Sequence, residues 1–84
     1  NAFSPNNDGM NDLWNVKYLE SYANATVKVF SRYGGVVYQS NKGYAKPWNG
    51  QFNGIDLPIG TYYYIIDPKT KGRQVISGAV TILR

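Results

Sequence analysis

A regular alternation of residue types in the first half of the chain limits the folds that are open to it. Within residues 25–32, Ala25, Val27 and Val29 share one side of an extended strand, and the residues between them share the other. A period of two is typical of a half-buried β-strand. Helical periodicity never extends beyond a turn or two, and residues 16–23 are the one weak candidate for a helix. The alternation therefore predicts a fold made mainly of β-structure.

Further strands are expected where β-branched and aromatic residues concentrate, at residues 13–16, 36–40, 61–67 and 75–83. The pair Gly34-Gly35 predicts a two-residue hairpin turn, and Gly78 predicts a bulge or a close approach of another group to the backbone. Short strands separated by turns rich in glycine and asparagine are typical of a small β-sandwich.

Composition excludes several classes of protein. The chain has 84 residues, of which 43% are hydrophobic and 17% charged, and this indicates a single globular domain. It contains no cysteine and no histidine, which excludes disulfides, metal sites with thiolate or imidazole ligands, and catalytic Ser-His or Cys-His pairs. Asp8 and Asp12 lie in one tight segment without an opposing carboxylate, so they do not predict a glycosidase. We therefore expect no enzyme activity.

The positive charge of the chain does not indicate a nucleic-acid partner. The net charge is +4 and the pI about 9.4, but the nine basic residues are dispersed along the sequence instead of clustered. The longest apolar or aromatic run, residues 62–66, is far too short to span a bilayer. The chain begins at Asn1 and shows no signal peptide, so we expect a piece of a longer protein, with any export signal upstream. With no long apolar patch in the sequence, we expect a monomer.

The opening segment resembles a calcium-binding loop. Oxygen-bearing side chains at Asn6, Asp8 and Asp12 surround Gly9, as in loops that wrap a hard cation. Asn15 stands where an EF-hand needs a bidentate glutamate, so any calcium site made by Asn6, Asp8 and Asp12 would be weak. The alternative is a turn in which these side chains bind their own backbone amides. Beyond calcium, no cofactor is expected.

The aromatic residues allow two interpretations. The tryptophans and tyrosines can form a stacking platform for a sugar or for single-stranded nucleic acid. Alternatively, they form the core and pack between strands, and this is the role expected for Trp14, Trp48, Tyr62 and Tyr64. Alternation places Tyr62 and Tyr64 on one face of their strand and the tyrosine between them on the other.

Five short motifs follow one another along the chain: N-A-F-S-P-N-N-D-G-M-N-D at residues 1–12, V-K-V-F-S-R-Y-G at 27–34, W-N-G at 48–50, P-I-G-T-Y-Y-Y at 58–64 and G-A-V-T-I-L-R at 78–84. In this order, they resemble the gliding motility-associated C-terminal domain, also called the type B sorting domain of the type IX secretion system of Bacteroidota. Asn7, where glycine is common, and Ser31, where asparagine is common, are the departures.

The resemblance implies a fold and a function. The fold would be an Ig-like β-sandwich of about seven antiparallel strands, and residues 1–84 would form a single C-terminal secretion-targeting domain. Such domains direct large proteins, including gliding adhesins, through the periplasm and across the outer membrane to the cell surface or beyond. The implied partners are the type IX translocon and an outer-membrane protein of the PorP/SprF-like class. The rival hypothesis is a carbohydrate-binding or adhesive β-sandwich module.

Such an address must be read from a folded surface, either by pairing with a sheet edge or by docking onto loops. We expect the recognition residues in the two turn-forming motifs and at the end of the chain: Pro5, Asn6, Asp8, Gly9, Asn11, Asp12, Arg32, Tyr33, Gly34 and Arg84. The alternative is that these turns stabilise the sandwich. In that case Arg32 would stack on Trp14 or Trp48, or pair with Asp8 or Asp12.

Overall fold

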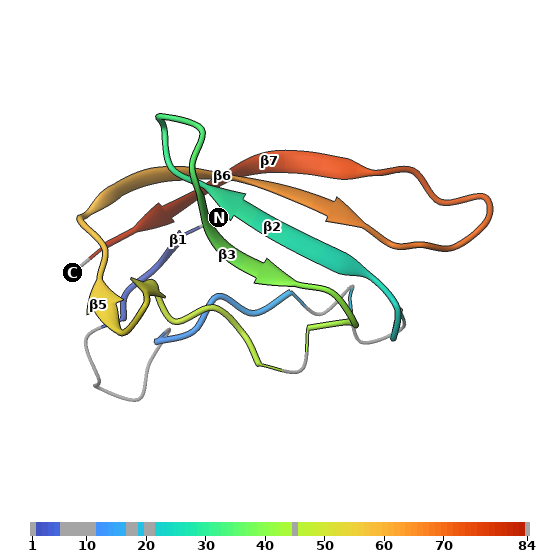
Figure 1. Cartoon of the computed structure of the whole chain (residues 1–84), viewed down its shortest axis with the longest axis horizontal. Coiled ribbons are helices and arrows are strands. Elements are labelled where there is room, and N and C mark those ends of the chain that lie inside the picture. The colour runs from blue at the N-terminus through green and yellow to red at the C-terminus, as the bar shows by residue number, and fades with distance from the viewer. Residues whose placement is uncertain (1, 6–11, 17–18, 20–21, 45, 84) are drawn as a thin grey trace.

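The computed structural model describes residues 2–5, 12–16, 19, 22–44 and 46–83. These residues form seven strands and no α-helix: β1 Ala2–Phe3, β2 Thr26–Phe30, β3 Val36–Ser40, β4 Gln51–Phe52, β5 Ile55–Asp56, β6 Gly60–Asp67 and β7 Ile76–Ile82 (Figure 1). The prediction of an all-β domain is confirmed. Among the described residues, no helix has the length and apolar character needed to cross a membrane.

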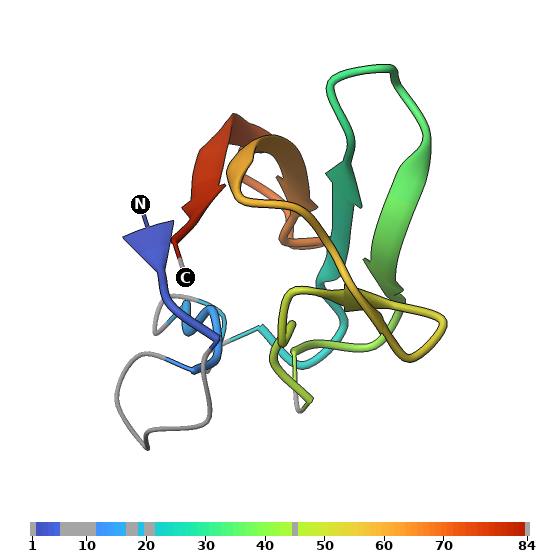
Figure 2. The same cartoon turned by 90° about the vertical axis from the view of Figure 1, so that its left-hand side faces the viewer.

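Five of the strands form one sheet in the order β1-β7-β6-β2-β3, and β4 pairs with β5 in a separate two-stranded sheet. The long strand β6 lies at the centre, antiparallel to β2 and to β7. β1 instead runs parallel to β7, which is possible because the two strands are far apart in sequence and no tight turn joins them. Figure 2 shows the larger sheet curving around the segment that carries β4 and β5. The architecture is compatible with an Ig-like sandwich whose second layer is largely irregular.

The core lies on the inner face of the larger sheet. Val27 and Val29 of β2 are buried, as their alternation predicts, and so are Val80 and Ile82 of β7. The full set of buried hydrophobic residues is Phe3, Trp14, Leu19, Ala25, Val27, Val29, Val37, Trp48, Tyr62, Ile66, Val80 and Ile82. Every strand of the larger sheet contributes at least one of these side chains, so burial of apolar area stabilises the sheet as a unit.

The strand expected at residues 13–16 is wrong in extent. Here the structure has only an isolated bridge between Trp14 and Trp48, in which the Trp14 amide donates to the Trp48 carbonyl at 2.9 Å. Leu13 and Asn15, on either side of Trp14, are both exposed. The segment therefore buries one large ring against the sheet instead of presenting a continuous half-buried strand.

The Tyr44 hydroxyl joins the two tryptophan segments. It donates a hydrogen bond to the Trp14 carbonyl at 2.5 Å and accepts one from the Trp48 amide at 2.9 Å. The Trp14 ring meets the Tyr44 ring edge-on at 5.9 Å between centroids, and Trp48 meets Tyr62 in the same way at 5.6 Å. Backbone groups of the irregular layer that would otherwise be unpaired next to the core are thereby satisfied.

The expected close approach at Gly78 is present. A Cβ atom built on Gly78 would lie 2.6 Å from the Tyr64 hydroxyl oxygen, because the Tyr64 ring extends from β6 across the backbone of β7. Tyr64 also contacts Trp14, with 5.0 Å between the ring centroids. Glycine at position 78 therefore leaves the space that this ring occupies.

The Tyr44 bridge generates the first prediction. Tyr44→Phe keeps the ring but leaves the Trp48 amide and the Trp14 carbonyl without this partner, so it should lower the free energy of unfolding by about 1–3 kcal/mol. Urea denaturation followed by tryptophan fluorescence measures the loss. Tyr33→Phe is the matched control, because that side chain is 85% exposed. Equal stabilities of the two variants would contradict the role of the bridge.

The same hydroxyl predicts the response of stability to alkaline pH. Burial raises the pKa of Tyr44, and the hydrogen bond from the Trp48 amide offsets part of this effect. Above the unfolded-state pKa of about 10, the unfolded chain therefore loses the Tyr44 proton while the folded protein retains it, and stability falls as pH rises. Tyr44→Phe should show a smaller loss of stability between about pH 8 and about pH 11 than the parent protein. An equally steep loss of stability in both proteins would mean that titrating groups other than Tyr44 cause the pH dependence.

Candidate recognition surface

The hairpin between β2 and β3 places Arg32 and Tyr33 at its tip. The Gly34 amide donates to the Ser31 carbonyl at 2.9 Å, so Arg32 and Tyr33 occupy the two central positions of the turn. The Ser31 amide in turn donates to the Gly35 carbonyl at 2.8 Å. Gly34 adopts a positive φ of 90°, which closes this wider loop onto β3. The prediction of a two-residue Gly34-Gly35 turn is therefore wrong, since glycine ends the turn and the motif's larger side chains are displayed.

A second turn lies beside this tip. Residues 57–59 connect β5 to β6, and the Tyr62 hydroxyl donates to the Pro58 carbonyl at 2.8 Å, which holds the turn against the sheet. The Leu57 amide donates a hydrogen bond to the Gly50 carbonyl at 2.9 Å. Between the two turns lies a groove of about 250 Å³, lined by residues 31–33 and 57–62, which we call the tip groove. Two motifs that are far apart in sequence thus form one surface.

The tip groove combines exposed apolar groups with one positive charge. Tyr33 is 85% exposed and Ile59 61% exposed, although both are large hydrophobic residues. Among the described residues that line the groove, Arg32 is the charged one, and its guanidinium lies 5.2 Å from the centroid of the Tyr33 ring. This is a cation–π contact between neighbours on the surface. Because Trp14 and Trp48 are buried, Arg32 stacks on its own neighbour and not on either tryptophan.

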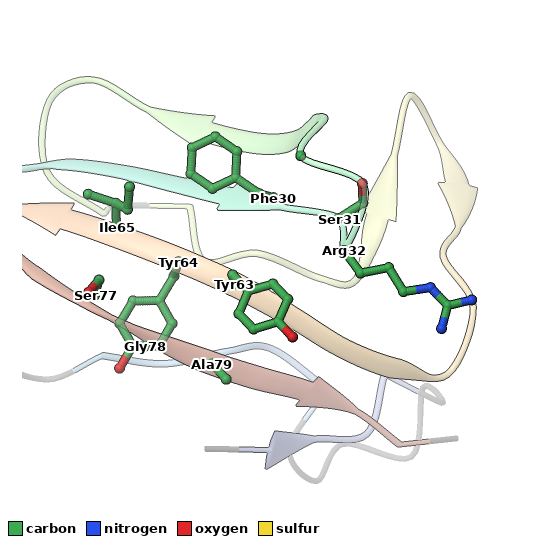
Figure 3. Close-up of a pocket in the computed structure, with 10 residues that line it drawn as sticks. Phe30, Ser31, Arg32, Tyr63, Tyr64, Ile65, Ser77, Gly78 and Ala79 are labelled. Carbon is green, nitrogen blue, oxygen red and sulfur yellow. The ribbon is translucent and has the colours of Figure 1, made fainter.

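The same hairpin tip also borders an open hollow on the outer face of the larger sheet. Figure 3 shows the rings of Phe30 and Tyr63 on this face, with the Arg32 side chain extending away beyond the end of β2. Tyr63 is 49% exposed and Ile65 42% exposed. Residues of β2, β6 and β7 line this hollow together with Gly34.

The structure describes residues 2–5 and 12 of the opening motif, and none of these lines the tip groove. A Cβ atom on Gly50 would lie 2.9 Å from Pro5, so the proline packs tightly against the W-N-G motif. Asp12 lines a polar hollow of about 250 Å³ together with Pro5, Leu13, Asn49, Gln51 and Asp56. The structure therefore brings Pro5 and Asp12 together, but not with Arg32 and Tyr33.

Several predicted site residues lie outside the described part of the chain: Asn6, Asp8, Gly9, Asn11 and Arg84. The calcium hypothesis for Asn6, Asp8 and Asp12 therefore stays a prediction. Within the described ranges, no group of three or more acidic residues gathers in a way that would hold a metal ion.

The tryptophans are not available as a stacking platform. Trp14 is 4% exposed and Trp48 1% exposed, and the Trp48 indole nitrogen donates to the Gln51 carbonyl at 3.1 Å. Tyr62 is buried with them, and Tyr64 packs against the core. A sugar needs an exposed ring face, so this arrangement removes the main support for the carbohydrate-binding hypothesis.

Sequence reasoning missed Pro58 and Ile59 as surface residues of the candidate site. Both lie within the P-I-G-T-Y-Y-Y motif, whose pattern points first to the strand that follows. An isoleucine placed between proline and glycine in a turn was the available signal, because a turn rarely buries such a side chain.

The family model described as the CHU_C Type IX secretion signal domain matches residues 1–82. The chain belongs to this family. Its role as a C-terminal signal for type IX secretion, predicted from the five motifs, is thereby confirmed. Membership relates the domain to the secretion system and to export across the outer membrane, and it points to a non-catalytic role.

One solved structure supports the fold. PorZ, described as an essential bacterial surface component of the type IX secretion system of the human oral-microbiomic Porphyromonas gingivalis, matches with a TM-score of 0.57 and 23% sequence identity. The match covers 74% of this chain and 8% of the PorZ chain. At this identity the likeness shows a shared fold. The search among curated proteins gave no match.

Exposure at the hairpin tip predicts that the signal's displayed side chains can be changed without loss of the fold. Arg32→Ala and Tyr33→Ala should each alter the free energy of unfolding by no more than about 0.5 kcal/mol. Gly34→Ala should cost about 1 kcal/mol, because its φ of 90° is unfavourable for a residue with a Cβ atom. Urea denaturation of the three variants gives the comparison. If Arg32→Ala proved as costly as Gly34→Ala, Arg32 would be a scaffold residue.

Proposed function

We propose that this signal domain directs a cell-surface protein, such as a gliding adhesin, across the outer membrane, and that the export machinery recognises it at the tip groove. The direct receptor in this proposal is an outer-membrane protein of the PorP/SprF-like class, acting with the type IX translocon. The destination is the cell surface or the medium. The domain acts as a folded address and performs no chemistry of its own.

The observation that carries the choice of surface is the convergence of two family-type motifs at the tip groove. Tyr33 and Ile59 are displayed there, although folding favours the burial of such large apolar side chains. The scaffold does not need them in this position, because the turns are held by backbone bonds at Ser31 and by the Tyr62 hydroxyl. Exposed aromatic and arginine side chains beside a hollow are typical of the residues that dominate protein interfaces.

The chemistry of the groove indicates what the receptor presents. Tyr33, Pro58 and Ile59 offer an apolar cleft for one inserted side chain, and Arg32 at its border offers donors for a carboxylate. Pairing of Arg32 with an acidic residue would mainly set the orientation and rate of docking, whereas burial of Tyr33 and Ile59 would supply affinity.

Export of a reporter tests both parts of the proposal. Residues 1–84 are fused behind a reporter that carries a general export signal, and secreted reporter is measured in a gliding bacterium with and without its type IX machinery. We expect reporter outside the cell only when the machinery is intact. The double variant Tyr33→Ala/Ile59→Ala should reduce secretion about tenfold, which corresponds to about 1.4 kcal/mol of lost recognition.

A matched control separates recognition from general surface effects. Lys71→Ala removes an exposed positive charge from the β6–β7 loop, at the other end of the sheet, and should leave secretion unchanged, whereas Arg32→Ala should reduce it. Retention of the parent fusion in the periplasm of intact cells would overturn the function. Normal secretion of the Tyr33/Ile59 variant would overturn the choice of surface and leave the function standing.

A further inference from the structure

In the described part of the chain, one edge of the larger sheet lacks a partner strand over most of its length. β7 pairs with β6 along all of Ile76–Ile82, and on its other side the described residues of β1 pair with Thr81 and Ile82. Among the described residues, no strand pairs with the outer edge of residues 76–80. At about 3.3 Å per residue, this leaves roughly 15 Å of strand edge available.

The open edge lacks the features that normally protect a sheet edge. Residues 76–82 contain no charged residue and no proline, and Ser77, Gly78 and Ala79 are all small. The opposite edge strand, β3, is shorter and irregular, because its register with β2 shifts between Val29 and Phe30. Natural sheets keep exposed edges short, bulged or charged, so a long, uncharged edge such as that of β7 indicates that another strand covers it.

The free backbone groups on this edge can be assigned. The Leu83 amide donates to the Phe3 carbonyl at 2.8 Å, so residue 83 directs its amide toward the β1 side. Because backbone groups alternate along a strand, the amides of Ser77 and Ala79 point to the same side as that of Leu83. These two amides face the open edge.

The register of β1 shows which segment of the protein can pair with the open edge of β7. β1 runs parallel to β7, with Ala2 opposite Thr81 and Phe3 opposite Ile82. A strand that continued β1 backward, one residue at a time, would lie opposite Val80, Ala79 and then Gly78 without any turn. Figure 1 shows β1 and β7 running side by side toward the same end of the sheet, with the rest of β7 extending past the start of β1.

We propose that the residues joining the cargo to this domain extend β1 as a parallel strand along the open edge of β7, opposite residues 76–79. The inference rests on the proposed function, in which the cargo precedes its C-terminal signal. Phe3 points into the core and Ala2 is exposed, so the linker side chains would alternate in the same phase. Linker and domain would thus form one continuous sheet.

Tyr64 gives this added strand a specific contact. Its hydroxyl lies over Gly78, and no hydrogen bond joins it to the described residues. In Figure 3, the Tyr64 ring crosses β7 beside Gly78 with its oxygen at the outer side of the strand. An inward-facing polar linker residue opposite Gly78 can therefore bind this hydroxyl.

The added strand would set where the cargo lies. Gly60 and Ile82 are paired at the end of the sheet that carries the tip groove, whereas Ile66 and Ile76 are paired at the opposite end. A linker parallel to β7 enters at Ile76 and runs toward Ile82. It would hold the cargo at the end away from the tip groove, so that the receptor can reach the groove.

Hydrogen exchange in the full exported protein tests the inference. The natural protein is compared with a version in which the linker before residue 1 is replaced, residue for residue, by glycine and serine, which have low strand propensity. Peptides covering residues 75–80 are followed by mass spectrometry. We expect exchange at Ser77 and Ala79 to be at least about tenfold slower in the natural protein.

A variant checks the backbone pairing directly. Ala79→Pro removes an amide that faces the open edge without removing a bond to β6, so it should weaken protection of Ser77 in the natural protein. Ala79→Ser keeps the amide and should preserve that protection. The inference is supported if exchange at Ser77 is slow in the natural protein and in Ala79→Ser, and faster with the Gly/Ser linker and in Ala79→Pro.

Two results would overturn it. Equally fast exchange in both versions means that the edge stays open, and equally slow exchange means that something other than the linker covers it. Neither result bears on export, because secretion of both versions is measured separately. Failure of secretion in the natural protein would instead overturn the proposed function, whatever the exchange shows.

Discussion

The hydroxyl of Tyr44 is the interaction on which the second layer of this domain depends. The larger sheet can bury its inner face only if something covers it, and the described covering segments form a single short hairpin, β4 with β5. Two tryptophans bury their rings there, and their backbones meet in an isolated bridge. By binding both the Trp14 carbonyl and the Trp48 amide, Tyr44 lets irregular chain lie against an apolar core without leaving polar groups unpaired. Many small domains are stabilised by disulfides or by metal sites with cysteine or histidine ligands. This sequence contains neither cysteine nor histidine, so it cannot form them.

The residues of the family's motifs have two different roles: some pack to stabilise the fold, and others are exposed on its surface. Pro5 packs on Gly50, Trp48 fills the core, and Tyr62 holds the turn before β6. Arg32, Tyr33 and Ile59 contribute little to this scaffold and are exposed at one end of the sheet. The proposed recognition at the tip groove uses this division, because side chains that the scaffold does not need are the ones displayed to a receptor. A rigid sheet with short, backbone-bonded turns positions the exposed side chains at low entropic cost on binding.

The two ends and the two edges of the sheet are also unequal, and this asymmetry suits a domain that connects two partners. One end carries the tip groove, and the β6–β7 loop lies at the other. One edge strand is short and irregular, whereas β7 is long and uncharged, and among the described residues no strand pairs with the outer side of its first five residues. A receptor at the first end and a linker along β7 would not compete for the same surface.

The sequence by itself determined the all-β class, four of the strands to within a residue or two, the buried alternation of Val27 and Val29, the close approach at Gly78 and the family. These depend on local period, on turn-forming residues and on short motifs, all of which are encoded within a few neighbouring positions. Only the tertiary structure decided that Trp14 forms a bridge instead of a strand, that Arg32 and Tyr33 rather than the glycines occupy the turn, and that Ile59 lies beside them. It also decided that β1 pairs in parallel with β7. Each of these features joins residues distant in sequence or depends on backbone angles that a residue pattern does not specify, and packing alone selects among the alternatives.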